Sequence, residues 1–254
     1  MNALLQLEGV VAGYGRGDIL HGVDLELLPD SVTCLVGPNG AGKSTVLKTL
    51  SGLLRPRAGR IVFNGKEIGG LSPARVLAEG IVQVPQDRSL FPMMSVWENL
   101  LMGAHSLRDR AATRRRADEV AGRFPLIRER RNDKAGALSG GQQKLVEIAR
   151  ALMLQPKLVM LDEPTMGLEP KARHAIFEVI ADLNRDGQTV LLVEQNARTG
   201  LAYADRGAVL DGGRVALEGS GQELLADSRM AELYLGGAPA ASRKPLHAAH
   251  ITPN

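Results

Sequence analysis

The sequence predicts an α/β fold with a mostly parallel sheet and one helical insertion, and three observations lead to this expectation. Short apolar runs alternate with helical runs through most of the 254 residues, which is typical of parallel strands covered by helices. Strand-like sequence disappears between residues 95 and 133, where charged helical sequence replaces it. With 44% apolar residues, a chain of this length can bury a large core.

The expected elements follow from the change between these two patterns along the chain. Strands are expected over residues 4–7, 24–28, 33–36, 60–63, 81–84, 158–161 and 189–193. Helices are expected over residues 43–51, 170–184 and 197–204. Two further strand-like runs, residues 207–211 and 214–218, are joined by Gly212-Gly213 and predict a hairpin.

The domain organisation follows from the interruption of the strand pattern. We expect one core built from residues 1–94 and 134–235, with residues 95–133 as a helical subdomain inserted into it. Ser95 and Glu98 form an S-x-x-E capping box that opens this insertion. From residue 236 onward Gly, Ala, Pro and Ser dominate and no period survives, which predicts a disordered tail.

Composition disfavours several classes of protein. Lys plus Arg number 31 and Asp plus Glu 28, giving a net charge of +3 with both signs interspersed, so no dense basic field is present. Aromatic residues at 3% leave little for a base-stacking surface. We therefore expect no nucleic-acid partner.

Cysteine usage and hydropathy bear on location. The single cysteine, Cys34, can form no internal disulfide, which fits a reducing compartment, and its apolar neighbours predict a buried strand residue. No secretory signal is visible at the start of the sequence, and no window approaches about 18 uninterrupted apolar residues. If the protein works at a membrane, we expect another chain to span it.

A phosphate-binding loop is the first motif with chemistry. The run Gly37-Pro38-Asn39-Gly40-Ala41-Gly42-Lys43-Ser44 matches G-x-x-x-x-G-K-[ST] between an expected strand and an expected helix. Glycines let backbone N–H groups converge on an oxyanion, and the positive end of the following helix adds to the attraction. Lys43 supplies a point charge and the Ser44 hydroxyl can ligate Mg²⁺.

Two carboxylates at the end of another strand supply what a nucleotide hydrolase also needs. Residues 158–161 are an apolar run that ends at Asp162 and Glu163. Asp162 is expected to hold Mg²⁺ through water, and Glu163 to orient the attacking water as general base. In a chain that also carries the loop at Lys43, this pair predicts nucleotide hydrolysis.

A third motif is a helix start. Leu138-Ser139-Gly140-Gly141-Gln142 precedes apolar residues spaced as one helical face, and the helix is expected over residues 138–152. Ser139 and Gln142 satisfy an S-x-x-Q capping box without any ligand, so the motif alone indicates a helix cap. Lys144, Glu147 and Arg150 are interpreted as the polar face of this helix.

With these motifs in order, residues 4–236 closely resemble the nucleotide-binding subunits of ABC transporters. The resemblance identifies residues 138–142 as the signature motif and Gln86, in Val84-Pro85-Gln86, as the Q-loop residue that serves the metal. It also implies that Tyr14 stacks on adenine and that Thr45 belongs to the nucleotide site. Gln195 occupies the switch position of the catalytic site, and Glu169 lies near the D-loop.

The resemblance implies an architecture and a working unit. The expected fold is a P-loop NTPase with an ABC-type core, N-terminal antiparallel strands and a helical subdomain. ATP and Mg²⁺ are the expected cofactors. Two subunits are expected to pair head to tail, so that ATP on the loop of one is enclosed by Ser139, Gly140, Gly141 and Gln142 of the other.

Two positions depart from the usual pattern of the family. Most members carry His at the switch position, whereas this chain carries Gln195, which can donate a hydrogen bond but cannot become cationic near neutral pH. Glu169 stands where Asp is usual in the D-loop region.

The residues around the switch are similar to those of one ATPase subunit of branched-chain amino acid importers. The run Val193-Glu194-Gln195-Asn196-Ala197 carries this similarity. It implies uptake of branched-chain amino acids, powered from the cytoplasmic face of the cell membrane. The implied partners are a paralogous second ATPase, two transmembrane permease subunits and an extracytoplasmic solute-binding protein.

Other functions stay open at this stage. The equivalent ATPase of a urea or amide importer has a closely similar sequence, and lipopolysaccharide export uses a related cassette. A soluble ABC ATPase acting on nucleic acid is a more distant alternative, since such proteins usually carry a coiled-coil insertion or tandem cassettes. A GTP switch protein would need an N-K-x-D guanine motif, which Asn132-Asp133-Lys134 does not provide.

Overall fold

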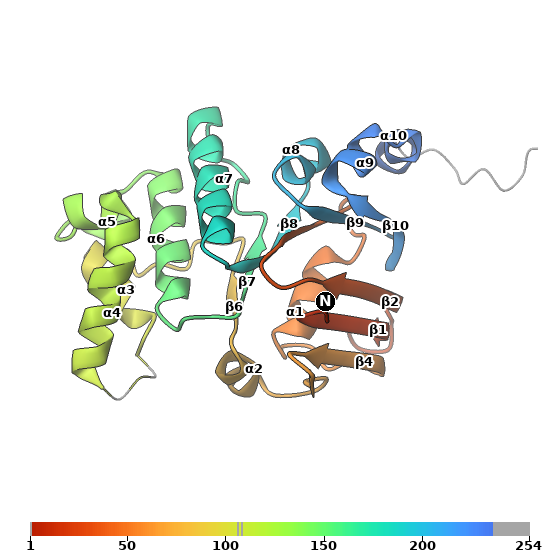
Figure 1. The fold of residues 1–254 in the computed structure, drawn as a ribbon, viewed down its shortest axis with the longest axis horizontal. Helices are drawn as coiled ribbons and strands as arrows, with labels where there is room; N and C mark the ends of the chain where they lie inside the picture. The colour runs from red at the N-terminus through yellow and green to blue at the C-terminus, as the bar shows by residue number, and fades with distance from the viewer. Residues whose placement is uncertain (1, 106, 108, 236–254) are drawn as a thin grey trace, which may run out of the picture.

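The computed structural model describes residues 2–105, 107 and 109–235 (Figure 1). The tail from residue 236, predicted to be disordered, lies outside this range. The described chain contains two β-sheets covered by helices, so the predicted α/β fold is confirmed. Helices α3 to α6 lie together at one side of the molecule, and α8 to α10 lie at the opposite side (Figure 1).

The N-terminal sheet is antiparallel, as the family resemblance implied. Its strand order is β2-β1-β4-β5. Strand β2 begins four residues earlier than predicted, because Leu20 and His21 pair with Ala12 and Val11 of β1 beyond a register irregularity at Gly22, which interrupts the apolar run. The strands are β1 (Leu5–Ala12), β2 (Leu20–Leu27), β4 (Ala58–Phe63) and β5 (Lys66–Glu67).

The second sheet has six strands in the order β10-β9-β3-β8-β7-β6. Neighbours from β9 to β6 are parallel, and β10 pairs antiparallel with β9 in the predicted hairpin. The strands are β3 (Val32–Val36), β6 (Ile81–Val84), β7 (Leu158–Asp162), β8 (Thr189–Glu194), β9 (Arg206–Asp211) and β10 (Arg214–Ser220).

The helices include three in the segment predicted as an insertion. These are α3 (Val96–Met102), α4 (Arg110–Arg123) and α5 (Pro125–Glu129). Helix α2 was not expected, because it is short and buries one residue, Val76, so it carries little apolar period. The others are α1 (Lys43–Leu50), α2 (Pro73–Glu79), η1 (Ala135–Ala137), α6 (Gly140–Leu152), α7 (Pro170–Arg185), α8 (Ala197–Ala202), α9 (Gly221–Ala226) and α10 (Ser228–Leu235).

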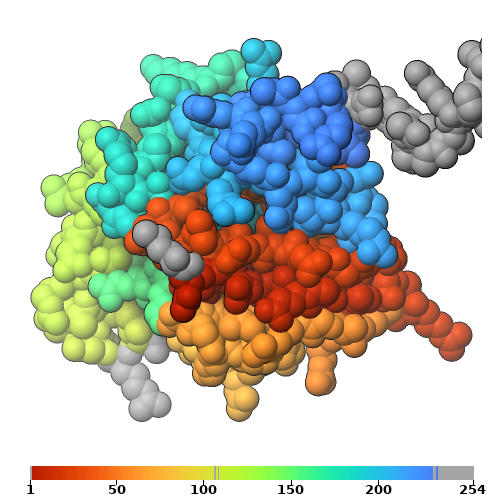
Figure 2. All heavy atoms as spheres, turned by 45° about the vertical axis from the view of Figure 1, so that its right-hand side comes forward, coloured from red at the N-terminus to blue at the C-terminus, as the bar shows by residue number. Residues whose placement is uncertain are grey.

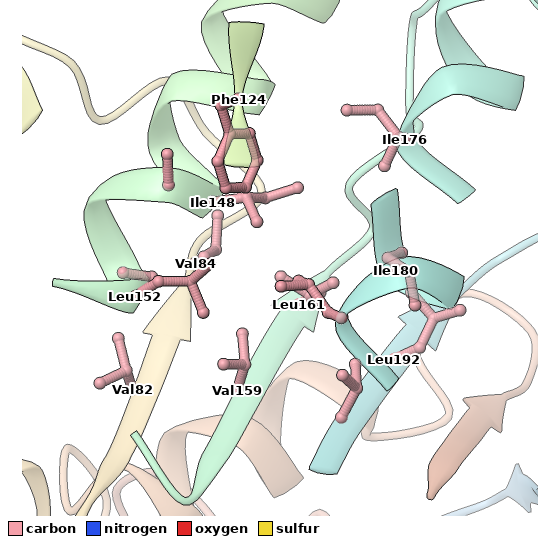
Figure 3. Close-up of a cluster of buried hydrophobic side chains, with 14 of the residues drawn as sticks. Val82, Val84, Phe124, Ile148, Leu152, Val159, Leu161, Ile176, Ile180 and Leu192 are labelled. Atoms are coloured by element: carbon pink, nitrogen blue, oxygen red, sulfur yellow. The ribbon is translucent and has the colours of Figure 1, made fainter. Parts of the chain in front are cut away.

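The parallel sheet is buried on both faces, which divides the core in two. Val159 and Leu161 of β7 point toward α6 and α7, where they meet Ile148 and Ile180 (Figure 3). The alternate residue Met160 points into the other core, between this sheet, α1 and the antiparallel sheet. Strands buried on both faces read as continuous apolar runs, which is why they were predicted well.

The N-terminal segments that surround the phosphate loop gather in one part of the surface. In the space-filling view the residues drawn red to orange lie together beneath the C-terminal segments drawn blue (Figure 2). The phosphate loop connects β3, in the parallel sheet, to α1, which packs against both sheets. The position of the phosphate loop is therefore fixed by β3 at one end and by the packing of α1 against both sheets at the other.

A substitution at Leu161 tests the packing that fixes the end of β7. Its side chain is fully buried, and Leu161→Ala is expected to lower the free energy of unfolding by about 2–5 kcal/mol because a cavity remains. Urea denaturation measures this loss. Leu53, which is 65% exposed, is the matched control, and its change to Ala is expected to cost less than about 0.5 kcal/mol. Equal losses would contradict the packing.

Candidate functional site

The phosphate loop lies between the end of β3 and the start of α1. A Cβ on Gly37 would lie 2.2 Å from the carbonyl oxygen of Leu210, so only glycine fits there. Gly40 and Gly42 have φ of 82° and 107°, in the left-handed region that favours glycine. Gly42 offers no side-chain cap to α1, so the first amides of this helix remain available to an anion.

Lys43 is buried at the start of α1. Its ammonium donates to the carbonyls of Gly37 at 2.8 Å and Pro38 at 3.2 Å. Its Nζ also lies 3.8 Å from Oε1 of Glu163. Burial lowers the pKa of Lys43, while the nearby carboxylates of Glu163 and Asp162 oppose this shift. The charge of Lys43 is thus held at the loop.

Asp162 ends β7 in a buried position with an unused acceptor. Its Oδ1 has no hydrogen-bond partner among the described residues. Burial, and then the neighbouring Glu163, raise the pKa of Asp162 to about 6. A desolvated carboxylate with a free oxygen is suited to a divalent cation or its water shell.

The residues present therefore fit Mg²⁺ bound together with a nucleotide. No group of three or more His, Cys, Asp or Glu residues that could hold a metal ion occurs in the described part of the chain. Mg²⁺ usually binds through one or two protein oxygens together with substrate phosphates and water. Asp162, Ser44 and Gln86 would supply the protein side of such a site.

Glu163 has a strained backbone and two charged or polar neighbours. Its φ is 42°, in the left-handed region, and its N–H donates to the carbonyl of Val193 at 2.9 Å. Gln86 donates from Nε2 to Oε2 of Glu163 at 3.3 Å. Strain of this kind persists where the surroundings over-determine it and is common at active sites. The Q-loop residue and the expected general base thus touch across 77 positions of sequence.

Gln195 lies just beyond β8 and lines the same cleft as Glu163. The residue before it, Glu194, is buried and accepts a 2.8 Å hydrogen bond from the hydroxyl of Thr165. Burial raises the pKa of Glu194, an effect that the Thr165 bond opposes. The end of β8 is thereby tied to the loop that follows Glu163. Sequence patterns gave no signal for this link.

Tyr14 lies beside the helix that follows the phosphate loop. Its ring is 46% exposed, and Nζ of Lys48 in α1 lies 5.4 Å from the ring centroid. Ser44 is exposed next to buried Lys43 and Thr45. An exposed ring next to the loop is suited to stacking, and Tyr14 retains its predicted role as a candidate.

The signature motif is not joined to the phosphate loop within one chain. The capping box is confirmed: Ser139 N–H donates to Gln142 Oε1 at 3.0 Å, and Gln142 N–H donates to Ser139 Oγ at 3.4 Å. No hydrogen bond or ion pair of the described residues links Ser139 or Gln142 to Lys43 or Glu163. The first amides of α6 therefore do not complete the site of their own chain.

The interpretation of Lys144, Glu147 and Arg150 as a polar face is wrong insofar as it implies exposure to water. Lys144 is 7% and Glu147 2% exposed. Together with Arg150 they contact the segment from Pro85 to Ser89. A polar stripe at helical spacing does not reveal which segment covers it, so the sequence could not show this packing.

Comparison with known proteins decides the family. Residues 20–166, more than half of the chain, match the profile of the ABC transporter family. The chain belongs to this family. The ABC transporter ATPase fold accounts for the order of the motifs and for both sheets.

Two relatives and one solved structure illustrate the similarity. A high-affinity branched-chain amino acid transport ATP-binding protein of Pseudomonas aeruginosa is 41% identical, covering 92% of this chain and 100% of the relative. A probable branched-chain amino acid transport ATP-binding protein of Archaeoglobus fulgidus is 39% identical, covering 89% and 95%. An ABC transporter ATP-binding cassette solved in its ADP conformation is 32% identical with a TM-score of 0.83, covering 93% and 100%.

This ABC ATPase binds nucleotide and couples its hydrolysis to transport, as its family does. In the part of the chain that the structure describes, no helix is both long and apolar enough to cross a membrane.

Replacing the expected general base should separate nucleotide binding from turnover. Glu163→Gln keeps the shape of the side chain but cannot accept a proton from water. We expect ATP hydrolysis to fall by about 10²–10⁴-fold, while the ATP affinity measured by calorimetry changes little. Glu178→Gln, at an exposed glutamate of α7, is the control. Full turnover in Glu163→Gln would refute the role of Glu163.

Asp162 predicts a pH-dependent effect on the stability of the nucleotide-free chain. The pKa of Asp162 is about 6 in the folded chain against an ordinary value of 3.8, so above pH 6 the folded chain keeps a desolvated negative charge. The penalty fades as pH falls from about 6 to 4, because the folded state then binds a proton that the unfolded state does not.

Asp162→Asn removes this penalty. The variant is therefore expected to raise the free energy of unfolding by about 2 kcal/mol at pH 7.5. Urea denaturation across this pH range should show the gain shrinking below about 1 kcal/mol at pH 4. A gain that does not change with pH, or a loss of stability at pH 7.5, would contradict the burial of this charge.

Proposed function

We propose that the chain is the ATP-hydrolysing subunit of an importer of branched-chain amino acids. Support comes from the relatives at 41% and 39% identity, whose names specify branched-chain amino acid transport. The run Val193–Ala197 around the switch supports the same assignment. No residue of an ATPase subunit need touch the transported solute, so the choice of solute belongs to partner chains.

The working unit proposed here has several chains. Two ATPase subunits, this chain and a paralogue, bind two transmembrane permease subunits at the cytoplasmic face of the cell membrane. A solute-binding protein delivers the amino acid to the permeases from the other side. Residues 1–94 and 134–235 form the ATPase core in this proposal, and residues 95–133 form the helical subdomain that faces the permeases.

The nucleotide site is proposed to lie between the two ATPase subunits. The phosphate loop, residues 37–42, binds the phosphates through its backbone N–H groups, of which Pro38 has none, together with Lys43, Ser44 and Thr45. Tyr14 stacks on adenine. Ser139, Gly140, Gly141 and Gln142 of the second subunit enclose the same ATP. Two helix N-termini, one from each subunit, face the terminal phosphate and attract it from both sides. Loss of that phosphate by hydrolysis removes the attraction that keeps the two subunits closed around ATP.

The chemistry proposed at this site depends on four side chains. Asp162 and Gln86 serve Mg²⁺, which would offset charge on the phosphates when bound. Glu163 accepts a proton from the attacking water, and Gln195 donates a hydrogen bond to the terminal phosphate. Gln86 and Lys43 both contact Glu163, so the proposed general base lies beside a side chain that serves the metal and one that binds phosphate.

Uptake in the host tests the proposed function. Cells lacking this chain should lose high-affinity uptake of labelled leucine, and the parental chain should restore it. A chain carrying Glu163→Gln is the matched control, since it should assemble without restoring uptake. Normal leucine uptake in the deletion strain, with loss of urea or amide uptake instead, would overturn the solute assignment and favour the alternative importer.

The switch residue predicts a slower site than one bearing His. Gln195 can hydrogen-bond the terminal phosphate but cannot carry positive charge. In the assembled transporter, Gln195→His is therefore expected to raise the turnover of ATP severalfold, by about as much as one charge-assisted hydrogen bond exceeds a neutral one. Steady-state hydrolysis at saturating ATP measures it. An unchanged or reduced rate would count against this role of Gln195.

A further inference from the structure

Every polar group of Ser89 is bound to helix α6. The Ser89 N–H donates to Oε1 of Glu147 at 2.5 Å, and its hydroxyl donates to the same oxygen at 3.1 Å. The Ser89 carbonyl accepts from Nη1 of Arg150 at 2.9 Å, and the hydroxyl also accepts from Nη2 of Arg150. One residue of the Q-loop segment is thus fixed entirely by two side chains of the signature helix.

Lys144 fixes the other end of the same segment. Its ammonium donates to the carbonyls of Pro85 at 3.0 Å and Gln86 at 3.3 Å. It also lies 2.7 Å from Oε2 of Glu147, an oxygen that accepts no hydrogen bond of good geometry in the described chain. The two buried charges therefore neutralise each other while their remaining donors and acceptors bind the segment.

The energetics favour a role in position over a role in stability. Burying an ion pair costs much of the attraction that it gains, and apolar residues of similar size are often as stabilising. The Lys144–Glu147 pair instead fixes the backbone of residues 85–89, which cannot shift without breaking several charge-assisted hydrogen bonds. Gln86 extends from that backbone to Glu163 at 3.3 Å.

We propose that Lys144, Glu147 and Arg150 are positioning residues that fix the Q-loop segment to the signature helix and so hold Gln86 against Glu163. The inference rests on the proposed role of Gln86 in hydrolysis. A consequence is that α6 carries two tasks at once. Its first turn presents the signature motif, and its next two turns set the position of Gln86 in the site of its own chain.

A double-mutant cycle tests this role. Glu147→Ala is expected to lower kcat for ATP hydrolysis by about 10-fold in the parental chain but by less than about 2-fold in a Gln86→Ala chain, as coupled residues should. KM for ATP should stay within about 2-fold, because the phosphate loop is untouched. The assays use the assembled transporter with ATP and Mg²⁺, and a thermal unfolding curve is recorded for each variant chain.

Two further variants supply a control and an alternative to Glu147→Ala. Glu178→Ala, at an exposed glutamate of α7, is the matched control and should leave kcat unchanged. Ser89→Ala removes only the shared hydroxyl and leaves the buried charges in place, so it serves if Glu147→Ala does not fold. It should also lower kcat only where Gln86 is present. Equal losses in both backgrounds, or no loss in the parental background, would overturn the proposal.

Hydrogen exchange supplies a readout that needs no hydrolysis. The Ser89 amide is predicted to exchange slowly in the parental chain and at least about 10-fold faster in Glu147→Ala, since its acceptor is gone. Unchanged exchange over residues 85–90 would refute the attachment itself. If the assembled transporter hydrolyses no ATP while the exchange behaves as predicted, the proposed function fails and the attachment stands.

Discussion

The site depends on one electrostatic arrangement, the convergence of Lys43 with the carboxylates that follow β7. The ammonium lies 3.8 Å from Glu163 and is held by two loop carbonyls, and Asp162 lies close enough to influence its pKa. A cation and two carboxylates in a partly desolvated space attract a phosphate and a divalent ion together. Binding of the phosphate alone or of the divalent ion alone would leave charge at this site uncompensated.

The parallel sheet is what brings these charged residues together. Parallel strands bring the ends of β3, β7 and β8 to one edge of the sheet, which places Lys43, Glu163 and Gln195 near one another. Cores on both faces of the sheet fix those ends. Helix α6 packs on one of these cores and carries both the signature motif and the side chains that hold the Q-loop segment.

Sequence patterns predicted what local chemistry dictates. The doubly buried strands, the phosphate loop and the capping boxes at Ser95 and Ser139 were all recognisable, since each depends on residues close in sequence. Links between segments distant in sequence were not recognisable from these patterns. Neither the Thr165–Glu194 bond nor the attachment of Ser89 to Glu147 has a local signal, because a polar stripe on a helix can face either water or a buried backbone.

A calorimetric titration of ATP and Mg²⁺ into the full-length chain, parental and Lys43→Ala, is the decisive test of the phosphate site. We expect measurable heat of binding for the parental chain and none for the variant, because removing the ammonium leaves the phosphates facing buried carboxylates without compensation. Affinity in the micromolar range retained by a folded Lys43→Ala chain would contradict this expectation, as would a parental chain that ignores ATP and Mg²⁺ altogether.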